Sequence, residues 1–558
     1  MDKEEENYMR VKWSDLILIW LGVWFVHLAS LLMFFNVANA CLPIILLQSV
    51  YTITGLTVFY FFPGFLLLLG IKKDKEVCFA DFLSSVILSI IILVLNVNLI
   101  RILNIGITRW GLLGITTLIS LIFYIYFCGL RHKNEFFLPA SIKISLKRFV
   151  AVFVTLLLLT AVFALPLIKQ ANFVFDCRQE AILSLPTGAQ TDLHEKVGMM
   201  RGLRSGFFPY WHLEHEDKFG FLAYELAPTY IYFINSVIFG DSFFIFYLYF
   251  FCCLLLASLI AWELAQGSFE RIRNYGSGAI ILAAMCGYYW LVLKYPNHIA
   301  ISTHLWVFLL LAQIFALSVR AWPLFYCACA LAFFTKEISL VFSWVLVITF
   351  AGIFLERKQA GNLYKRLGAV SGLLILFVLG FGIFTKNLPV MGKIFAWDYL
   401  GRYDYFGLLR GFFREGHTPL RPQTDLWNNV DFIAWVIGGS FFQAIFFFFP
   451  SKDKLTRWLT YSGLMYILAV LLSQFKLIHY AFFLILLSAP VCYRKIKGRG
   501  QAWAMVIALI FPLFVFAVRD RYDEYFFSRY SHMNRILFNN SFDFHREMEK
   551  MKHEHPVD

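Results

Sequence analysis

Residues 16–35 read "LILIWLGVWFVHLASLLMFF", and this run sets the class of the protein. A helix rises about 1.5 Å per residue, so a helix of this length would cross the roughly 30 Å hydrocarbon core of a bilayer. Comparable runs occur further along the chain, "VILSIIILVLNVNLI" at 86–100 and "AWAMVIALIFPLFVFAV" at 502–518. The sequence therefore predicts an all-α protein, a polytopic transmembrane helical bundle.

The composition supports this class. Of the 558 residues, 60% are hydrophobic, 19% are aromatic and only 15% are charged, and the mean hydropathy is +0.68. The formal net charge of +13 does not require nucleic acid as a partner, because membrane proteins concentrate Lys and Arg in their cytoplasmic loops. We expect membrane lipids as partners and no nucleic acid.

Apolar runs of sufficient length predict about 13–15 spans. The run 42–70 is over-long and contains Pro43 and Pro63, so it is either one tilted helix or a re-entrant piece followed by a helix. The split between 322–335 and 337–355 is the least secure. The predicted spans are 15–36, 42–70, 79–100, 109–130, 149–168, 242–263, 277–294, 299–319, 322–335, 337–355, 368–385, 431–449, 458–474, 477–492 and 501–518.

The distribution of charge predicts the orientation. With a cytoplasmic N-terminus, alternate connections fall inside, and these are rich in Lys or Arg, as the positive-inside rule requires. An odd number of spans then places the C-terminal tail outside, and the strong bias fits a multi-pass protein of a bacterial inner membrane. The basic connections are "IKKDKEV", "RHKNEFFLPASIKISLKR", "ERIRN", "ERKQAGNLYKR", "SKDKLTR" and "CYRKIKGRG".

The same topology divides the chain into three parts. Residues 1–148 form N-terminal transmembrane helices, 149–518 form the core, and 519–558 form the external tail. The core carries two long external loops, 169–241 and 386–430, which keep many aromatic residues. Disordered linkers are depleted of aromatic residues, so we expect both loops to pack on the membrane surface and to bear interfacial helices.

The stretch "TDLHEKVGMMRGLRSGFFPYWHLEHED", residues 191–217, gathers titratable groups in the first of these loops. Asp192 is a plausible helix N-cap, with Glu195 three residues later as in a capping box, and an interfacial surface helix would explain both. The same position also suits a general base, because a carboxylate beside helix N–H groups stays ionised and can accept a proton from an incoming hydroxyl. His194 lies two residues further on and would orient that carboxylate or touch a phosphate.

Several segments resemble the GT-C superfamily of membrane glycosyltransferases. "TDLHEKVGMMRGLRSGFFPYW" followed by "FLAYELAPTYIYFINSVIFG" is similar to the first large external loop of that superfamily. "ALAFFTKEIS" at 330–339 places Lys336 and Glu337 where two short spans meet, and "LLSQFKLIHYAFFLILLSAP" at 471–490 resembles a late span start of the same proteins. The resemblance covers about residues 150–518 and departs from the pattern in one respect: five spans precede the loop, where the better-known members have one, so the first four would be an extension.

This resemblance implies a reaction. Such enzymes take a sugar from a polyprenyl-phosphate donor and pass it to a lipid or glycan acceptor on the external face. It implies Asp192 as the base, with Asp176 in "NFVFDCRQEA" as the alternative because that residue lies closer to the end of its span. His194 and Glu214 would assist.

The donor phosphate requires cations near the outer ends of spans. The resemblance and the topology together indicate Lys336, Lys476, His479 and Arg519, with Lys294 and Arg521 as further candidates. Lys and Arg at span ends also snorkel to the headgroups without any role in binding. That alternative is weaker for Lys336, which sits in an apolar stretch beside Glu337, where a buried pair is costly without a partner.

Other chemistry stays open. "HLEHE" at 212–216 is not HExxH and suits a solvated loop better than a metal site, so a divalent cation is an open alternative and no cofactor motif is present. We expect His298 and His304 to cap a helix or to hydrogen-bond within the bundle rather than to coordinate an ion. Two other functions compete with the transferase: a polysaccharide polymerase or ligase using the Arg-rich loop 386–430, and a transporter of lipid-linked glycans, which would be expected to show repeated halves and charged sites at the midplane.

Overall fold

A computed structural model defines the fold, and its described residues divide into two compact units. The N-terminal unit is drawn from Met1–Phe207 and Thr229–Tyr249, and the C-terminal unit from Phe208–Pro228 and Phe250–Glu524. Each unit is described by itself. The described residues are 8–36, 41–72, 77–103, 106–131, 135–139, 146–158, 200, 203, 226–240, 244–266, 275–294, 302–336, 339–384, 422–472 and 480–496.

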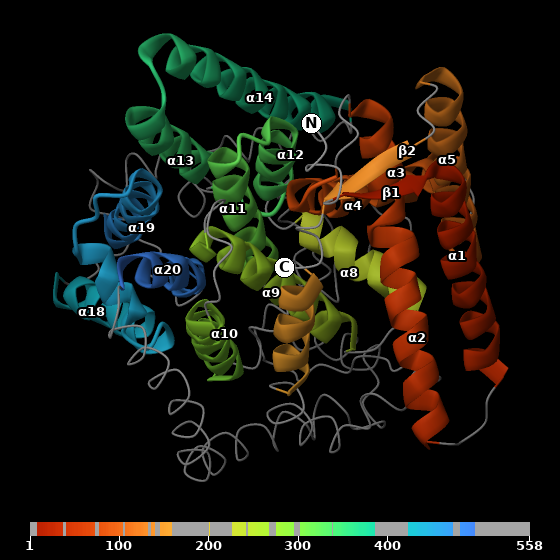
Figure 1. The fold of residues 1–558 in the computed structure, drawn as a ribbon, viewed down its shortest axis with the longest axis horizontal. Helices are drawn as coiled ribbons and strands as arrows, with labels where there is room; N and C mark the ends of the chain where they lie inside the picture. Colours follow the sequence, from red (N-terminus) through yellow and green to blue (C-terminus); the bar gives the residue numbers. More distant parts are fainter. Residues whose placement is uncertain are drawn as a thin grey trace, which may run out of the picture. The chain divides into compact units, whose positions relative to one another are not determined.

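The N-terminal unit is built from long apolar helices. In Figure 1, α1 and α2 run side by side, and α3 packs against both α4 and α5. Residues 146–158 are also helical. The labelled helices are α1 (Trp13–Asn36), α2 (Cys41–Tyr60), α3 (Phe62–Ile71), α4 (Phe79–Ile102), α5 (Arg109–Arg131) and α8 (Leu226–Phe239), the last of which contributes its residues from Thr229 onward.

The over-long run 42–70 forms two helices, α2 and α3, which together include one stretch long enough to cross a membrane, Ser49–Ile71. The helix is interrupted at Phe61. Pro63 lies in the first turn of α3, where the N–H that proline lacks would have no partner within the helix. Helix α4 satisfies the backbone at the break, because the Ser89 hydroxyl donates to the Phe61 carbonyl (3.1 Å) and accepts from the Gly64 N–H (2.8 Å). Gly64 permits this approach, since a Cβ there would lie 2.0 Å from the Ser85 carbonyl oxygen.

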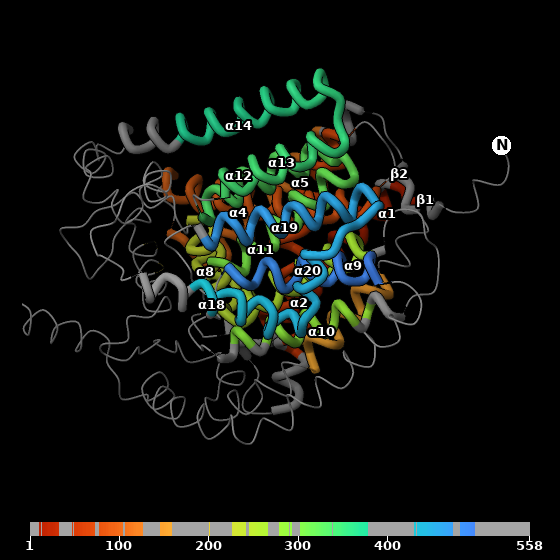
Figure 2. The backbone as a smooth tube through the Cα atoms, turned by 90° about the vertical axis from the view of Figure 1, so that its left-hand side faces the viewer, coloured from red at the N-terminus to blue at the C-terminus, as the bar shows by residue number. Residues whose placement is uncertain are grey.

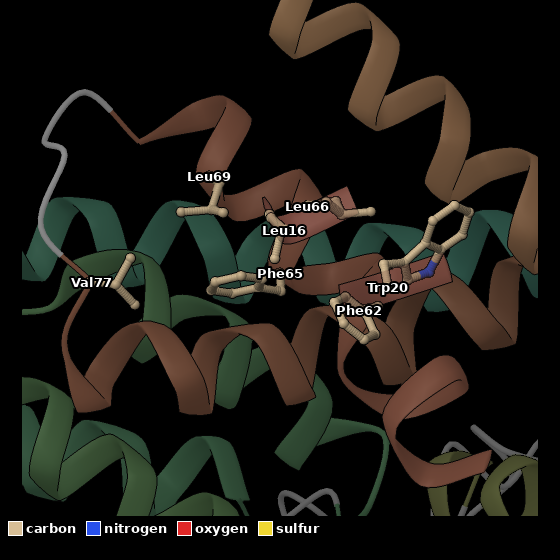
Figure 3. Close-up of a cluster of buried hydrophobic side chains, with 7 residues drawn as sticks. All are labelled: Leu16, Trp20, Phe62, Phe65, Leu66, Leu69 and Val77. Atoms are coloured by element: carbon tan, nitrogen blue, oxygen red, sulfur yellow. The ribbon is translucent and has the colours of Figure 1, made fainter. Parts of the chain in front are cut away.

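A compact apolar cluster joins α1 and α3. Figure 3 shows side chains from both helices gathered around Phe65 and Leu66. The two contributions from α1 are four residues apart, so they lie on the same face of that helix. The cluster consists of Leu16, Trp20, Phe62, Phe65, Leu66, Leu69 and Val77.

The described residues are mostly helical, as predicted, and a short two-stranded sheet is added to the helices. Strand β1 (Tyr8–Lys12) pairs antiparallel with β2 (Glu135–Pro139). The register sets Lys12 opposite Glu135. The pairing of β1 with β2 joins positions far apart in the chain, which no local pattern reveals.

The C-terminal unit is a second helical bundle. Figures 1 and 2 both show α13 beside α19 and α11 beside α12, while α20 contacts α10, α18, α19 and η3. Helix α9 belongs to this unit from Phe250 onward. The helices are α9 (Phe244–Gln266), α10 (Tyr275–Lys294), α11 (Thr303–Ser318), α12 (Trp322–Phe333), α13 (Ser339–Phe354), α14 (Arg357–Phe384), α18 (Pro422–Gly439), η3 (Gln443–Phe448), α19 (Lys454–Leu472) and α20 (Ala481–Lys495).

Some apolar segments predicted in this unit form the expected helices, and others do not. The predicted division between 322–335 and 337–355 is confirmed, because α12 ends at Phe333 and α13 begins at Ser339. The prediction of one span over 431–449 is wrong: α18 ends at Gly439, and Phe441 and Phe442 adopt φ of 51° and 67° before η3. The basic connection "ERKQAGNLYKR" is not a loop either, since α14 already begins at Arg357.

The break in 431–449 has a tertiary cause. Gly287 of α10 lies directly against Gly439 of α18, where a Cβ on Gly287 would stand 1.7 Å from the Gly439 carbonyl oxygen. Two glycines let two backbones approach closely, a recurrent device in membrane bundles. The end of α18 is therefore determined by its packing on α10, which hydropathy does not report.

Several of the described helices are long and apolar enough to cross a membrane. Within the described residues, five helical stretches could cross a bilayer by length and composition, four of them in the N-terminal unit. The predicted span 501–518 and the second half of 149–168 lie outside the described residues. The five are Ser14–Leu32, Ser49–Ile71, Phe79–Ile102, Arg109–Tyr126 and Ile245–Ala265.

Candidate functional site

Lys336 is the predicted site residue whose side chain falls within the described part of the chain, while Lys294, a further candidate, ends α10 with its side chain outside that part. Lys336 lies in the turn that follows α12, and its side chain is 5% exposed. The other predicted residues lie outside the described residues, so their predictions stand as made. These are Asp176, Asp192, His194, Glu214, Lys476, His479 and Arg519.

The backbone around Lys336 is held on both sides. The Lys336 N–H donates to the Ala332 carbonyl at the end of α12 (2.9 Å), and the Lys336 carbonyl accepts from the N–H of Ser339 (3.0 Å). The Ser339 hydroxyl donates to the same two carbonyls, that of Ala332 (2.8 Å) and that of Lys336. These bonds fix the turn and therefore the origin of the lysine side chain.

The ammonium of Lys336 lies between two aromatic rings. Its Nζ is 5.2 Å from the centre of the Tyr480 ring and 5.6 Å from that of Trp306. The two rings are perpendicular, with an interplanar angle of 89° and centroids 5.5 Å apart. Cations within about 6 Å of an aromatic face are attracted by its quadrupole, so the rings compensate part of the cost of burying this charge.

A second layer of aromatic side chains fixes the two rings. Phe342 stacks on Tyr466 with centroids 4.7 Å apart, and both contact Trp306. The Tyr466 hydroxyl donates to the Tyr480 carbonyl (3.0 Å). The positions of both rings around the Lys336 ammonium are therefore determined by packing in the interior of the unit.

The first turn of α11 adds buried donors near this cluster. Thr303 and Trp306 are completely buried, and the Thr303 hydroxyl and the Trp306 indole nitrogen have no hydrogen-bond partner among the described residues. They are three residues apart and so lie on one face of the helix. A buried donor without a partner costs free energy, and such N–H and O–H groups suit an anion.

His304 fills a different place in the same turn. It is 1% exposed, and its Nδ1 lies 2.8 Å from the Tyr288 hydroxyl. Phe250 and Phe482 pack against its ring. The expectation that His304 hydrogen-bonds within the bundle is therefore confirmed.

The end of the first long loop is attached next to Lys336. The N–H of Ala227, which directly follows the first residue of α8, donates to the carbonyl of Phe334 (2.9 Å). Phe334 is two residues from Lys336. The last part of the loop 169–241 that belongs to the C-terminal unit is thus tied to the turn that carries the buried ammonium.

In the N-terminal unit, polar side chains of α2, α4 and α5 hydrogen-bond to α8 or to the stretch that precedes it. Arg101 donates to the Leu203 carbonyl (3.1 Å), within the stretch that also contains Asp192. Arg109 donates to the Val237 carbonyl (3.1 Å) near the end of α8. Further bonds run from Tyr51 to the Ile238 carbonyl, from Tyr60 to Asn235 (2.7 Å) and from Tyr230 to Asn98 (2.9 Å).

The aromatic environment of Lys336 was not predicted. Trp306, Phe342 and Tyr466 looked like ordinary apolar residues of three spans. Tyr480 alone had a signal, as the tyrosine of the late motif "LLSQFKLIHYAFFLILLSAP". Within the described residues no three His, Cys, Asp or Glu gather as a metal site would require, and "HLEHE" lies outside them.

Comparison with known proteins adds no relative: no family model matches the chain, and neither a curated protein nor a solved structure does so. The class that the structure itself shows is a largely helical protein with several helices apolar enough to span a membrane.

Proposed function

We propose that the chain is a membrane glycosyltransferase that moves a sugar from a polyprenyl-phosphate donor to a lipid or glycan acceptor on the external face. The observation that carries the proposal is the buried ammonium of Lys336 between Tyr480 and Trp306. A buried charge in a membrane protein is costly and usually marks a site of function. The buried donors of Thr303 and Trp306 suit a phosphate.

The reaction requires two groups with opposite tasks. The acceptor hydroxyl attacks the anomeric carbon of the sugar while the bond from that carbon to the phosphate oxygen breaks. The proton of the hydroxyl passes to Asp192, with Asp176 as the alternative base, and the electron pair of the broken bond leaves with the polyprenyl phosphate. Lys336 stabilises the charge that develops on this leaving phosphate, the kind of interaction that contributes most when it is preorganised.

Two attachments support this arrangement. Ala227 ties the end of the first long loop to Phe334, two residues from Lys336. Arg101 binds the Leu203 carbonyl in the stretch that contains Asp192. Two points of this loop, Leu203 and Ala227, both C-terminal to Asp192, are therefore hydrogen-bonded to neighbouring segments, each within its own unit.

The test is a glycan-transfer assay in membranes with Asp192→Asn and Asp176→Asn, at matched expression. Loss of transfer in one variant, with donor binding retained, identifies the base. Full transfer in both variants would reject the proposed mechanism and would favour the Arg-rich loop 386–430 and the ligase reaction.

The competing transporter function has one feature in its favour, the broken run 431–449. Transporters use free backbone groups at such breaks to coordinate their substrates. Here the break is already satisfied: the Phe442 N–H donates to the Ile437 carbonyl (2.9 Å), and the Ser440 hydroxyl accepts from the Ala444 N–H (3.0 Å). Lys495 occupies the carbonyls of Phe446 and Phe449. We therefore retain the transferase.

A further inference from the structure

The turn after α18 holds two phenylalanines in an unfavourable backbone conformation. Phe441 and Phe442 have φ of 51° and 67°, and a left-handed conformation costs a residue with a side chain about 1–2 kcal/mol. Such strain persists only where the surrounding structure over-determines it, and it often accompanies a functional surface. The turn leaves Phe442 and Phe448 each 65% exposed, with Phe449 exposed beside them.

A run of basic residues follows these phenylalanines directly. Lys452 and Lys454 are exposed and Arg457 is half-buried. The one carboxylate in the run, Asp453, is already paired with Arg494 (2.9 Å) and accepts from the Thr456 N–H (2.9 Å). The Asp453 carboxylate is therefore neutralised by Arg494. It does not balance the positive charges of Lys452, Lys454 and Arg457.

The guanidinium of Arg457 is only partly satisfied. One of its terminal nitrogens donates to the Lys452 carbonyl (3.3 Å), whereas its Nε has no partner among the described residues. On the other side, the Lys495 ammonium donates to the carbonyls of Phe446 and Phe449. These bonds hold the phenylalanines next to the basic end of α20.

From this arrangement we propose that the aromatic–basic surface binds the headgroup phosphate of an anionic phospholipid. The surface consists of Phe442, Phe448, Phe449, Lys452, Lys454 and Arg457. Basic clusters beside a span attract anionic lipid headgroups, with each Lys or Arg contributing separately, and exposed phenylalanines next to them suit the acyl chains of the same lipid. A soluble anion would use the charges but not the phenylalanines. The proposal does not depend on the proposed transferase function.

The experiment uses the full-length protein purified in a neutral detergent and native mass spectrometry of bound lipid. Phosphatidylglycerol and phosphatidylcholine with identical acyl chains are compared at equal concentration. We expect the protein to bind phosphatidylglycerol about tenfold more strongly or better, and we expect this preference to weaken as salt is raised. Equal binding of the two lipids would overturn the proposal.

Variants locate the site. The triple variant Lys452→Gln, Lys454→Gln and Arg457→Gln should lose most of the preference. A matched control removes three exposed basic residues from α14, with Lys358→Gln, Lys365→Gln and Arg366→Gln, and should keep it. An equal loss in both variants would show that net charge alone acts, and would reject a site at this surface.

A second variant separates a lipid from a free anion. Phe442→Ser combined with Phe448→Ser keeps every charge and should weaken binding of phosphatidylglycerol several-fold, while the unfolding temperature reports whether the fold is intact. Inorganic phosphate is the competing probe. If inorganic phosphate displaced the lipid at equal concentration, or if the serine variant bound the lipid normally while folded, the lipid assignment would be wrong.

Discussion

The ammonium of Lys336 lies 5.2 Å from the centre of the Tyr480 ring, inside a bundle that buries both residues. The charge of a lysine in such a place costs stability unless its partners compensate it fully. Aromatic faces give about 0.5–2 kcal/mol each, which is less than the cost of removing an ammonium from water. A charge buried inside a membrane protein usually marks a functional site, and this is the reason to propose an anionic ligand beside Lys336.

The first prediction separates a functional Lys336 from a structural one. Lys336→Met keeps the length and volume of the side chain but removes its charge, so transfer should fall by about 10²–10³-fold. The unfolding temperature should stay the same or rise, because an apolar side chain of similar volume replaces a buried ion. Transfer rates and thermal unfolding of the same preparation check both parts.

Two further variants control this prediction. Lys336→Arg retains the positive charge and should restore part of the transfer. Lys358→Met removes an exposed lysine of α14 and should change neither quantity. If Lys336→Met lowered the unfolding temperature by many degrees and left the transfer of the remaining folded protein intact, the role of the lysine would be structural.

The second prediction concerns the contact of Gly287 with Gly439. Gly287→Ala would place a Cβ 1.7 Å from the Gly439 carbonyl oxygen, so α10 and α18 would have to separate. We expect a destabilisation of about 1–3 kcal/mol, as for other overpacked interiors, measured as a lower unfolding temperature. Gly438→Ala is the matched control, because a Cβ at Gly438 meets no atom within 4 Å. Equal stability of the two variants would contradict the close packing.

How much of this fold the sequence predicts depends on how local each feature is. Helices α1, α4 and α11 follow from apolar runs, because a helix that spans a bilayer satisfies its own backbone and needs only apolar side chains. The break after Gly439 depends on Gly287 of another helix, and β1 depends on a partner strand more than a hundred residues away. Those features are tertiary and leave no trace in hydropathy.

The candidate site likewise combines one residue that the sequence reveals with others that it does not. Lys336 stands out in the sequence because a charge within an apolar stretch is rare. Its neighbours Trp306 and Tyr480 do not, since aromatic residues are abundant in every span of this chain. The chemistry of a site can thus be recognised at one residue, while the rings that complete it emerge only when three helices pack.

The third prediction uses the ion pair of Asp453 with Arg494. Burial alone would raise the pKa of Asp453, but hydrogen bonds from Thr456 and Arg494 outweigh it and lower the pKa from 3.8 to about 2. The stabilisation from this pair is therefore complete above about pH 4, shrinks as the pH falls, and is lost below about pH 2. Its size is small, because half of the Asp453 side chain is exposed.

Thermal unfolding between pH 6 and pH 2.5 tests this dependence. Asp453→Asn should unfold at a slightly lower temperature than the parent at pH 6, and the difference should narrow toward pH 2.5. Arg494→Gln removes one of the groups that hold the Asp453 carboxylate ionised. Its unfolding temperature should also lie below that of the parent protein at pH 6, and this difference should narrow toward pH 2.5. A constant difference over the whole range would show that Asp453 does not titrate in this window.

The fourth prediction concerns how the N-terminal unit holds α8. Tyr51→Phe and Tyr60→Phe each remove only the hydroxyl that bonds to Ile238 or Asn235. Each should cost about 1 kcal/mol, and the double variant more, because both act on the same end of α8. If α8 positions the loop that bears Asp192, the double variant should also slow transfer while donor binding is retained.

The matched control is Tyr461→Phe in α19, where the ring is exposed and neither stability nor transfer should change. A double variant that loses stability but transfers sugar at the parental rate would show that the N-terminal helices support the fold of α8 without positioning the loop.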